Sequence, residues 1–171
     1  HQLEELFKIK IWVVSGKQEG ILAASGVLMG WPEASGIVCD IGGTSLELAY
    51  LKEGTIKKSQ SFKLGPLALD CFYQTEKIKT NMIHENLSMI EKGFPNSTQV
   101  FFLVGGCWRA LARIHMNMND YPLRVLQGYR ISVDSLNETL KYVSSTKSQT
   151  LAKVTTSSLE RLKLLPDASR V

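Results

Sequence analysis

Short apolar runs alternate along the chain with stretches in which apolar residues recur every three or four positions. A run of four to eight residues closed by glycine or proline is typical of a strand, and the wider spacing is typical of a helix. The runs predict strands at 8–14, 36–41, 45–51, 56–64, 100–104 and, more briefly, at 129–131.

The wider spacing predicts several helices between and after these strands. The first extends from Lys17 to Gly30, with Ile21, Ala24 and Leu28 on one face, and stops at 31–32 because proline cannot continue a helix. A second helix has its apolar face at Ile83, Leu87 and Ile90. A third has one face formed by Trp108, Leu111, Ala112 and His115.

In the last third of the chain, the pattern of residues predicts one more amphipathic helix and a polar helical tail. Ser132 or Ser135 can cap the helix, and Glu138 is placed for a capping box with Ser135. The tail is expected to be helical and to end near Pro166.

These elements indicate an α/β fold with a mixed sheet flanked by helices. Three strands joined by tight turns form a meander, and the strand at 100–104 leads directly into a helix. No linker rich in proline, glycine or serine divides the chain, so residues 1–171 are treated as one unit.

Composition and charge exclude several classes of protein. With 44% hydrophobic and 21% charged residues, the 171-residue chain is not disordered, and no apolar run approaches the roughly 18 residues that cross a bilayer. The net charge of +4 is mild and scattered, which argues against nucleic acid as a partner and suits an anionic substrate. Three well-separated cysteines are typical of reduced thiols in a cytoplasmic protein.

The most informative segment is the hairpin between Asp40 and Glu47. A symmetric turn centred between Gly43 and Thr44 places the two carboxylates opposite each other, with Cβ atoms about 4.5–5.5 Å apart. A hard cation such as Mg²⁺ would offset their repulsion, and we expect both carboxylates on a solvent-open face. The backbone N–H groups of Gly42 and Gly43 could then approach a phosphate closely, next to the hydroxyl groups of Thr44 and Ser45. The alternative is a hairpin that needs glycine only for its turn and carries two solvated carboxylates.

Two further elements suit the same chemistry. Gly105 and Gly106 lie between a strand and a helix, where free N–H groups favour anions, although glycine there can also serve packing alone. Glu19 lies in the first turn of the helix that begins at Lys17. A carboxylate at that position is either a simple helix-start preference or a base directed at a water molecule.

Together these segments resemble the exopolyphosphatase / guanosine pentaphosphate phosphohydrolase (Ppx/GppA) family. The matching text, in this order, is Ser15-Gly-x-x-Glu19, Asp40-Ile-Gly-Gly-Thr-Ser-Leu-Glu-Leu48, Gly65-Pro66 and Gly105-Gly106-x-x-Arg109-Ala-Leu-Ala-Arg113. The resemblance implies an actin-like, ribonuclease-H-like fold of the sugar kinase/Hsp70/actin superfamily. It implies that 1–171 is the second lobe of a two-lobe enzyme, with the first lobe before His1 and a continuation after the chain.

The resemblance also implies roles for individual residues. Glu19 matches the catalytic glutamate, and Asp40 and Glu47 match the acidic pair near a metal, expected to be Mg²⁺ or another divalent cation. The residues matching the phosphate-binding turns are Gly42, Gly43, Thr44, Ser45, Gly105 and Gly106. Thr44 departs from the family's third glycine and Cys107 from its usual threonine, which leaves substrate preference open.

The function implied is hydrolysis of terminal phosphoanhydride bonds of polyphosphate or guanosine pentaphosphate, with release of orthophosphate. The implied setting is the bacterial cytoplasm, without a membrane partner and with a possible homodimer in the full-length protein. The isolated lobe is expected to be inactive. An actin-like nucleotide-binding module, or a kinase-type phosphotransferase without polyphosphatase activity, is the alternative.

Overall fold

The structure is a computed structural model, and it describes residues 2–72, 75–96 and 100–168. The two ends of the expected lobe, residue 1 and 169–171, lie outside the described residues. The elements are α1 (Gln2–Phe7), α2 (Gly16–Gly30), β1 (Gly36–Ile41), β2 (Leu46–Lys52), β3 (Thr55–Phe62), α3 (Pro66–Phe72), α4 (Glu76–Gly93), β4 (Phe101–Val104), α5 (Gly106–Met118), α6 (Val133–Ser145), α7 (Ser148–Leu151) and α8 (Leu159–Ala168).

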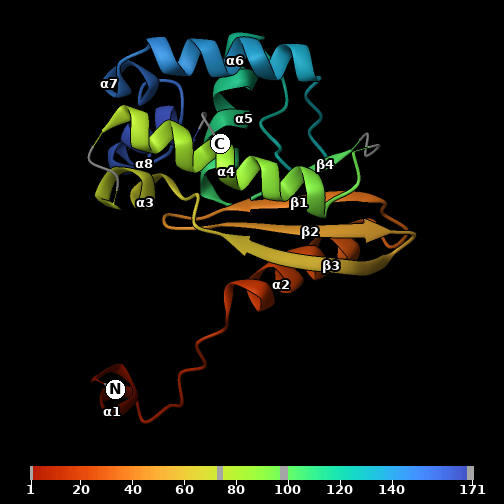
Figure 1. Cartoon of the computed structure of the whole chain (residues 1–171). Helices are drawn as coiled ribbons and strands as arrows, with labels where there is room; N and C mark the ends of the chain where they lie inside the picture. The colour runs from red at the N-terminus through yellow and green to blue at the C-terminus, as the bar shows by residue number, and fades with distance from the viewer. Residues whose placement is uncertain (1, 73–74, 97–99, 169–171) are drawn as a thin grey trace.

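Four strands form one mixed sheet in the order β3-β2-β1-β4. The meander β1-β2-β3 is antiparallel, and β4 lies parallel to β1 after a long connection (Figure 1). The expected α/β class, the mixed sheet and the strands of the meander are therefore confirmed, with ends that shift by one or two residues.

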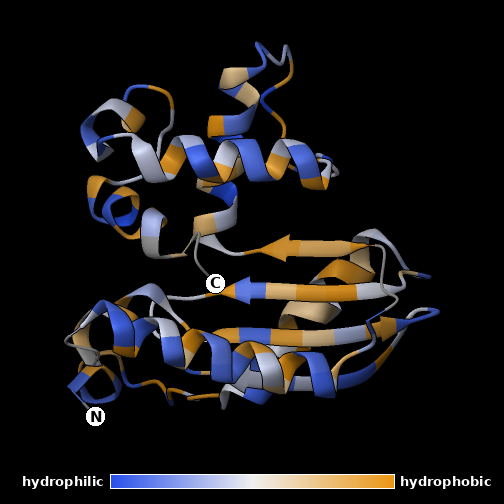
Figure 2. Ribbon diagram, turned by 45° about the horizontal axis from the view of Figure 1, so that its top comes forward, coloured by the Kyte–Doolittle hydropathy of each residue, from blue (hydrophilic) through white to orange (hydrophobic). Residues whose placement is uncertain are grey.

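The two faces of the sheet are covered unequally. Among the described helices, α2 is the one that covers one face, around a small core of Ala24, Val27, Ala34, Val38, Ala49 and Leu51. The other face carries the larger core, to which α3 to α8 all contribute buried side chains. In Figure 2 the strands β1, β2 and β4 are mostly hydrophobic, while the covering helices alternate between hydrophobic and hydrophilic residues.

Helix α2 begins where the sequence predicts. The Ser15 hydroxyl accepts a hydrogen bond from the Gln18 amide, and the Gln18 side chain accepts one from the Ser15 backbone N–H, which completes a capping box. The buried face begins one residue earlier than expected, at Gly20, and Ile21 remains 36% exposed. Gly20 thus lies against the sheet, and a larger side chain would push the helix away.

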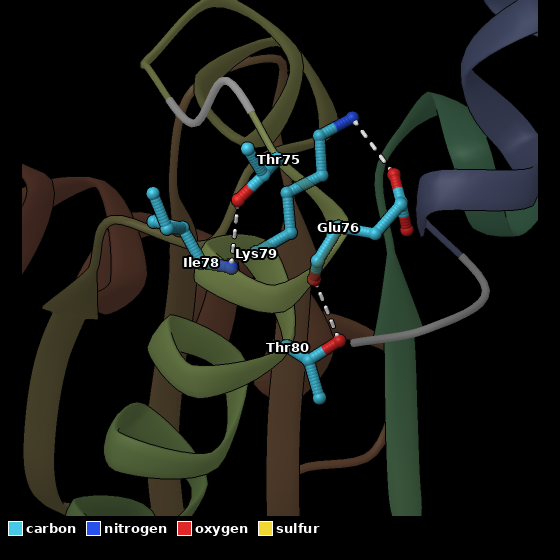
Figure 3. Close-up of polar contacts among 5 residues, drawn as sticks. All are labelled: Thr75, Glu76, Ile78, Lys79 and Thr80. Carbon is cyan, nitrogen blue, oxygen red and sulfur yellow. Dashed lines mark hydrogen bonds and ion pairs between the residues drawn. The ribbon is translucent and has the colours of Figure 1, made fainter.

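Helix α4 covers the other face through the three expected apolar residues. Its cap is Thr75, whose hydroxyl accepts from the Ile78 amide, and the Lys79 amine lies 3.6 Å from the Glu76 carboxylate (Figure 3). Ile83 is buried, and Leu87 and Ile90 pack against the large core, as predicted.

Two predicted strands are wrong. Residues 8–14 form no strand, and Trp12 and Val13 are 81% and 85% exposed, because no described strand lies beside this segment (Figure 1). Residues 129–131 also form no strand. There the Tyr129 hydroxyl lies 2.6 Å from Nδ1 of the buried His115, so a side-chain contact anchors the segment to α5.

The C-terminal part differs from expectation in two details. Ser132, not Ser135, caps α6, and its hydroxyl accepts from the Ser135 amide, so the capping box with Glu138 does not form. The tail is a core element rather than a polar one, since Leu162 and Leu165 of α8 are buried. No helix among the described residues combines the length and the apolar character needed to span a bilayer.

Candidate active site

The acidic pair lies where the hairpin register places it. Asp40 and Glu47 are direct partners across β1 and β2, as the spacing predicts. They alternate onto the same face as Val38 and Ala49, which pack under α2. The pair therefore lies on the α2 side of the sheet, at the end nearest the turn.

Glu47 is buried, which corrects the expectation of two solvent-open carboxylates. Only 1% of the residue is exposed, because the first turn of α2 lies over it: a Cβ atom at Gly16 would come 3.2 Å from Glu47 Oε1. Oε1 accepts a hydrogen bond of 2.7 Å from the Ser61 hydroxyl, whereas Oε2 is buried with no hydrogen-bond partner. Glu47 thus lies between α2 and the sheet, next to Gly16, Gly20 and the Ser61 hydroxyl.

Glu19 shares the electrostatic environment of the acidic pair. It is exposed in the first turn of α2, and its pKa is raised, first by desolvation and then by the negative charges of Glu47 and Asp40. The pKa of Asp40 is raised by desolvation and by Glu47, against the lowering effect of the Arg109 guanidinium. Carboxylates from three elements therefore influence one another electrostatically at this end of the sheet.

The turn between β1 and β2 is held in place by the segment that follows β3. The Gly42 amide donates to the Ser45 carbonyl at 2.9 Å, and the Leu67 amide donates to the Gly43 carbonyl at 2.7 Å. A Cβ atom at Gly65 would lie 2.3 Å from the Thr44 carbonyl carbon, so this glycine allows the close backbone contact. Gly43 and Thr44 remain exposed at the tip.

The departure at Thr44 introduces no backbone strain. The described non-glycine residues with positive φ are Lys8, Glu53 and Asp120, so Thr44 has an ordinary backbone conformation. The threonine therefore adds a hydroxyl group to the turn without the conformational penalty that a left-handed position would impose.

The second glycine turn lies against the first acidic residue. Gly105 has φ +100°, and a Cβ atom there would come 2.4 Å from Asp40 Oδ1. A Cβ atom at Gly106 would lie 2.8 Å from the guanidinium carbon of Arg161, which reaches over from α8. The start of α5, an acidic residue and an arginine are thus brought together, which are parts suited to binding an anion beside a cation.

A divalent cation fits the donor atoms present at this site. Mg²⁺ binds oxygen and is usually held by one or two carboxylates together with substrate phosphates. Glu47 Oε2 is a buried acceptor without a partner, and Asp40 lies directly opposite. Within the described ranges no three His, Cys, Asp or Glu side chains form a cluster that could hold a metal, so the protein would supply these two carboxylates and other oxygens would complete the shell.

Sequence reasoning assigned no role to four residues of this site. Gly16 and Gly20 let α2 approach the sheet, Ser61 contacts Glu47, and Arg161 reaches the second turn. The glycines were recognisable only as a pair four residues apart on one helix face, which is typical of close packing. Ser61 is a polar residue next to the apolar Phe62 on a predicted strand, which is also the pattern of an ordinary solvent-exposed position. No residue near Arg161 in the sequence indicates its contact with Gly106.

The comparison with known families agrees with this arrangement. The model of the Ppx/GppA phosphatase family matches residues 1–171. The chain belongs to the Ppx/GppA phosphatase family. No curated protein sequence matches it.

Solved structures of Ppx/GppA proteins show the same fold at low sequence identity. An exopolyphosphatase from Cytophaga hutchinsonii is 20% identical with a TM-score of 0.78, and the match covers 99% of this chain and 58% of that one. A PPX-GPPA enzyme from Aquifex aeolicus is 20% identical with a TM-score of 0.76, and the match covers 99% of this chain and 58% of that one. The actin-like fold is therefore confirmed, and this chain spans about three fifths of the length of these relatives.

Proposed function

We propose that this chain is the second lobe of a phosphatase that hydrolyses terminal phosphoanhydride bonds of inorganic polyphosphate, guanosine pentaphosphate or both. The observation that carries the proposal is the electrostatic interaction of Glu19, Asp40 and Glu47 at the end of the sheet that carries the two glycine turns. Family membership and the solved relatives support this chemistry.

In the proposed mechanism, the two glycine turns bind the phosphate groups of the substrate, and Glu19 orients the attacking water molecule. Backbone N–H groups of Gly43 and Thr44 at the exposed tip of the turn, together with those at the start of α5, would bind phosphoryl oxygens, whereas the Gly42 N–H already donates to the Ser45 carbonyl. Arg161 would add a positive charge. Glu19 would orient a water molecule for in-line attack and accept its proton. The raised pKa of Glu19 moves this carboxylate toward the range in which a base works well near neutral pH.

Asp40 and Glu47 would hold the divalent cation, for which we propose Mg²⁺. When bound, the cation would neutralise charge on the phosphate oxygens, as in phosphoryl transfer generally. Asp40 and Glu47 repel each other across the hairpin, and the Arg109 guanidinium offsets this only in part, since the pKa of Asp40 stays raised. A bound cation would offset the remaining repulsion.

The two-lobe arrangement is supported by the N-terminal segment. Helix α1 and the residues after it extend away from the sheet, and most of their large apolar side chains are exposed (Figure 1). The exposed ones are Leu3, Leu6, Phe7, Ile9, Ile11, Trp12 and Val13. We propose that the first lobe covers them and closes the cleft over Glu19. For the compartment we propose the cytoplasm, where the buried thiols of Cys39 and Cys107 would stay reduced.

The test is phosphate release by the full-length protein. Polyphosphate, guanosine pentaphosphate and ATP are supplied separately with Mg²⁺, and orthophosphate is measured against time. We expect release from polyphosphate or guanosine pentaphosphate at a rate well above that from ATP, and loss of release on chelation of the metal. Release from ATP alone, or transfer of the phosphoryl group to an acceptor other than water, would contradict the proposal in favour of a nucleotide-binding module or a kinase.

A further inference from the structure

We infer that Ser61 is a positioning residue for the proposed hydrolysis: it fixes one oxygen of Glu47 and thereby presents the other to the cation. The inference rests on the proposed function for its role in catalysis, but its structural basis is separate. Ser61 is the direct partner of Glu47 across β2 and β3, so its hydroxyl reaches the carboxylate from the neighbouring strand.

The two oxygens of Glu47 have different surroundings. Oε1 accepts a hydrogen bond of 2.7 Å from the Ser61 hydroxyl, and Oε2 has no partner although it is buried. Among the described residues, Ser61 is the one hydrogen-bond donor to this carboxylate. A buried acceptor without a partner costs free energy, so its retention is explained by an occupant that binds there during function.

Ser61 also contacts the helix that carries Glu19. A Cβ atom at Gly16 would come 2.4 Å from the Ser61 hydroxyl oxygen, so the first turn of α2 rests directly on this serine. Ser61 is therefore in contact with both the carboxylate of Glu47 and the helix turn of Glu19. A small hydroxyl side chain is the type that fits this gap and still donates to Glu47.

Ser59 provides a matched comparison on the same strand face. Its hydroxyl donates to the Lys17 carbonyl at 2.9 Å and lies 2.5 Å from where a Cβ atom at Gly20 would be. The two serines thus make equivalent contacts with α2 two residues apart. They differ in one respect: Ser61 donates to a buried carboxylate, and Ser59 donates to a backbone carbonyl.

Removal of the Ser61 hydroxyl frees Glu47 to rotate and to present either oxygen. Loss of a residue that orients a metal ligand typically lowers metal affinity or activity by about 10–100-fold. Turnover and cation affinity should therefore decrease, whereas substrate binding should change little, since neither Ser61 nor Glu47 belongs to the turns proposed to bind the substrate. A purely structural role would instead lower stability and leave turnover per folded molecule unchanged.

The first experiment measures phosphate release by the full-length protein with Ser61→Ala, Ser61→Thr and Ser59→Ala. For Ser61→Ala we expect kcat to fall about 10–100-fold while KM for polyphosphate stays within about twofold, because the effect acts through the cation. Ser61→Thr keeps the hydroxyl and should recover most of the lost turnover. Equal losses of turnover in Ser61→Ala and Ser59→Ala would overturn the inference.

The second experiment needs no catalysis and separates failure of the inference from failure of the proposed function. Binding of Mn²⁺ alone, as a spectroscopic substitute for Mg²⁺, is measured in the full-length protein by electron paramagnetic resonance. We expect Ser61→Ala to weaken Mn²⁺ affinity about tenfold and Ser59→Ala to leave it within about twofold of the original. This result would support the inference even if polyphosphate were not hydrolysed. Unchanged Mn²⁺ affinity in Ser61→Ala, or no Mn²⁺ binding by the unmodified protein, would overturn it.

Discussion

Along β2, adjacent residues belong to two different environments. Leu46 and Leu48 point into the large core on one face, and Glu47 lies between them under α2 on the other. The core face is closed by apolar side chains from several helices, whereas near the site the α2 face is closed by glycines and serines.

We propose that this difference separates the residues that stabilise the fold from those that carry the chemistry. Burial of apolar side chains on the core face stabilises the fold by roughly 1.5–3 kcal/mol for each large residue. On the α2 face, the repulsion between Asp40 and Glu47 and the unpartnered Oε2 atom destabilise it. Substitutions on the core face are therefore expected to change stability alone, and substitutions of the site residues on the α2 face are expected to change activity more than stability.

The largest effect is expected for Glu19→Gln in the full-length protein. A base that orients water contributes typically about 10²–10⁴-fold to the rate, so kcat should fall by that factor while substrate binding is nearly unchanged. Thermal unfolding should not change appreciably, because Glu19 is exposed. Steady-state phosphate release and direct binding of polyphosphate measure the two quantities. Near-normal turnover would remove Glu19 from the mechanism and leave Glu47 as the next candidate base.

The matching test on the core face is Leu48→Ala. Leu48 is 5% exposed, and truncation of a buried leucine costs about 2–5 kcal/mol of unfolding free energy. Urea unfolding measures this loss, and Leu22→Ala, at a position 60% exposed on α2, is the control with an expected change within about 0.5 kcal/mol. A fall in kcat per folded molecule of Leu48→Ala would show that the two faces are not separable.

The sequence predicts the structure correctly where the contacts that determine it are local. The strand at 36–41 has the predicted bounds because a buried β-rich run is closed by glycine at both ends, and the Asp40–Glu47 pairing follows from the symmetry of the turn. The segment at 8–14 has equally suitable composition but no neighbouring strand among the described residues. A pattern of residues indicates the capacity to pair, and whether a partner exists is a property of the tertiary structure.

The same limit applies to the site. Burial of Glu47 is caused by Gly16 and Gly20 on a separate helix, and the position of Arg161 depends on how α8 packs against α5. The spacing of the two glycines indicates close packing but not which residues they pack against, and no local pattern indicates the contact of Arg161 with Gly106. Sequence reasoning therefore predicted the acidic residues and the glycine turns of the candidate site, but not the side chains that the structure places around them.

Gly105→Ala tests whether the second turn is built around Asp40. Its φ of +100° is strained for any residue with a Cβ atom, and that atom would lie 2.4 Å from Asp40 Oδ1. A loss of about 1–3 kcal/mol is expected, with a weaker cation site because Asp40 must move. Gly26→Ala is the matched control: nothing lies within 4 Å of its Cβ position, and alanine in a helix should stabilise by about 0.5–1 kcal/mol. Equal small effects of both substitutions would contradict the close packing at Gly105.

The smallest expected effect is a gain in stability in Asp40→Asn without metal. Desolvation and Glu47 raise the pKa of Asp40 in the folded state, so the folded protein binds this proton more tightly than the unfolded chain does. Ionised Asp40 therefore destabilises the fold at neutral pH, and the penalty disappears as pH falls through the raised pKa toward the unfolded value of about 3.9.

Asparagine removes this charge while keeping the shape of the side chain. In a chelator at pH 7, urea unfolding should show Asp40→Asn to be more stable than the original protein by roughly 0.5–1 kcal/mol, the size of a cross-strand charge effect. The difference should shrink toward zero near pH 4, where Asp40 is increasingly protonated in both states. It should also shrink at pH 7 when Mg²⁺ is added, because the cation binds more tightly to the protein that retains both carboxylates and stabilises it more. Excess Mg²⁺ should also restore part of the turnover that Asp40→Asn loses. A destabilised Asp40→Asn at both pH values would instead identify Asp40 as a structural hydrogen-bond acceptor, and the α2 face would no longer differ from the core face in the way proposed.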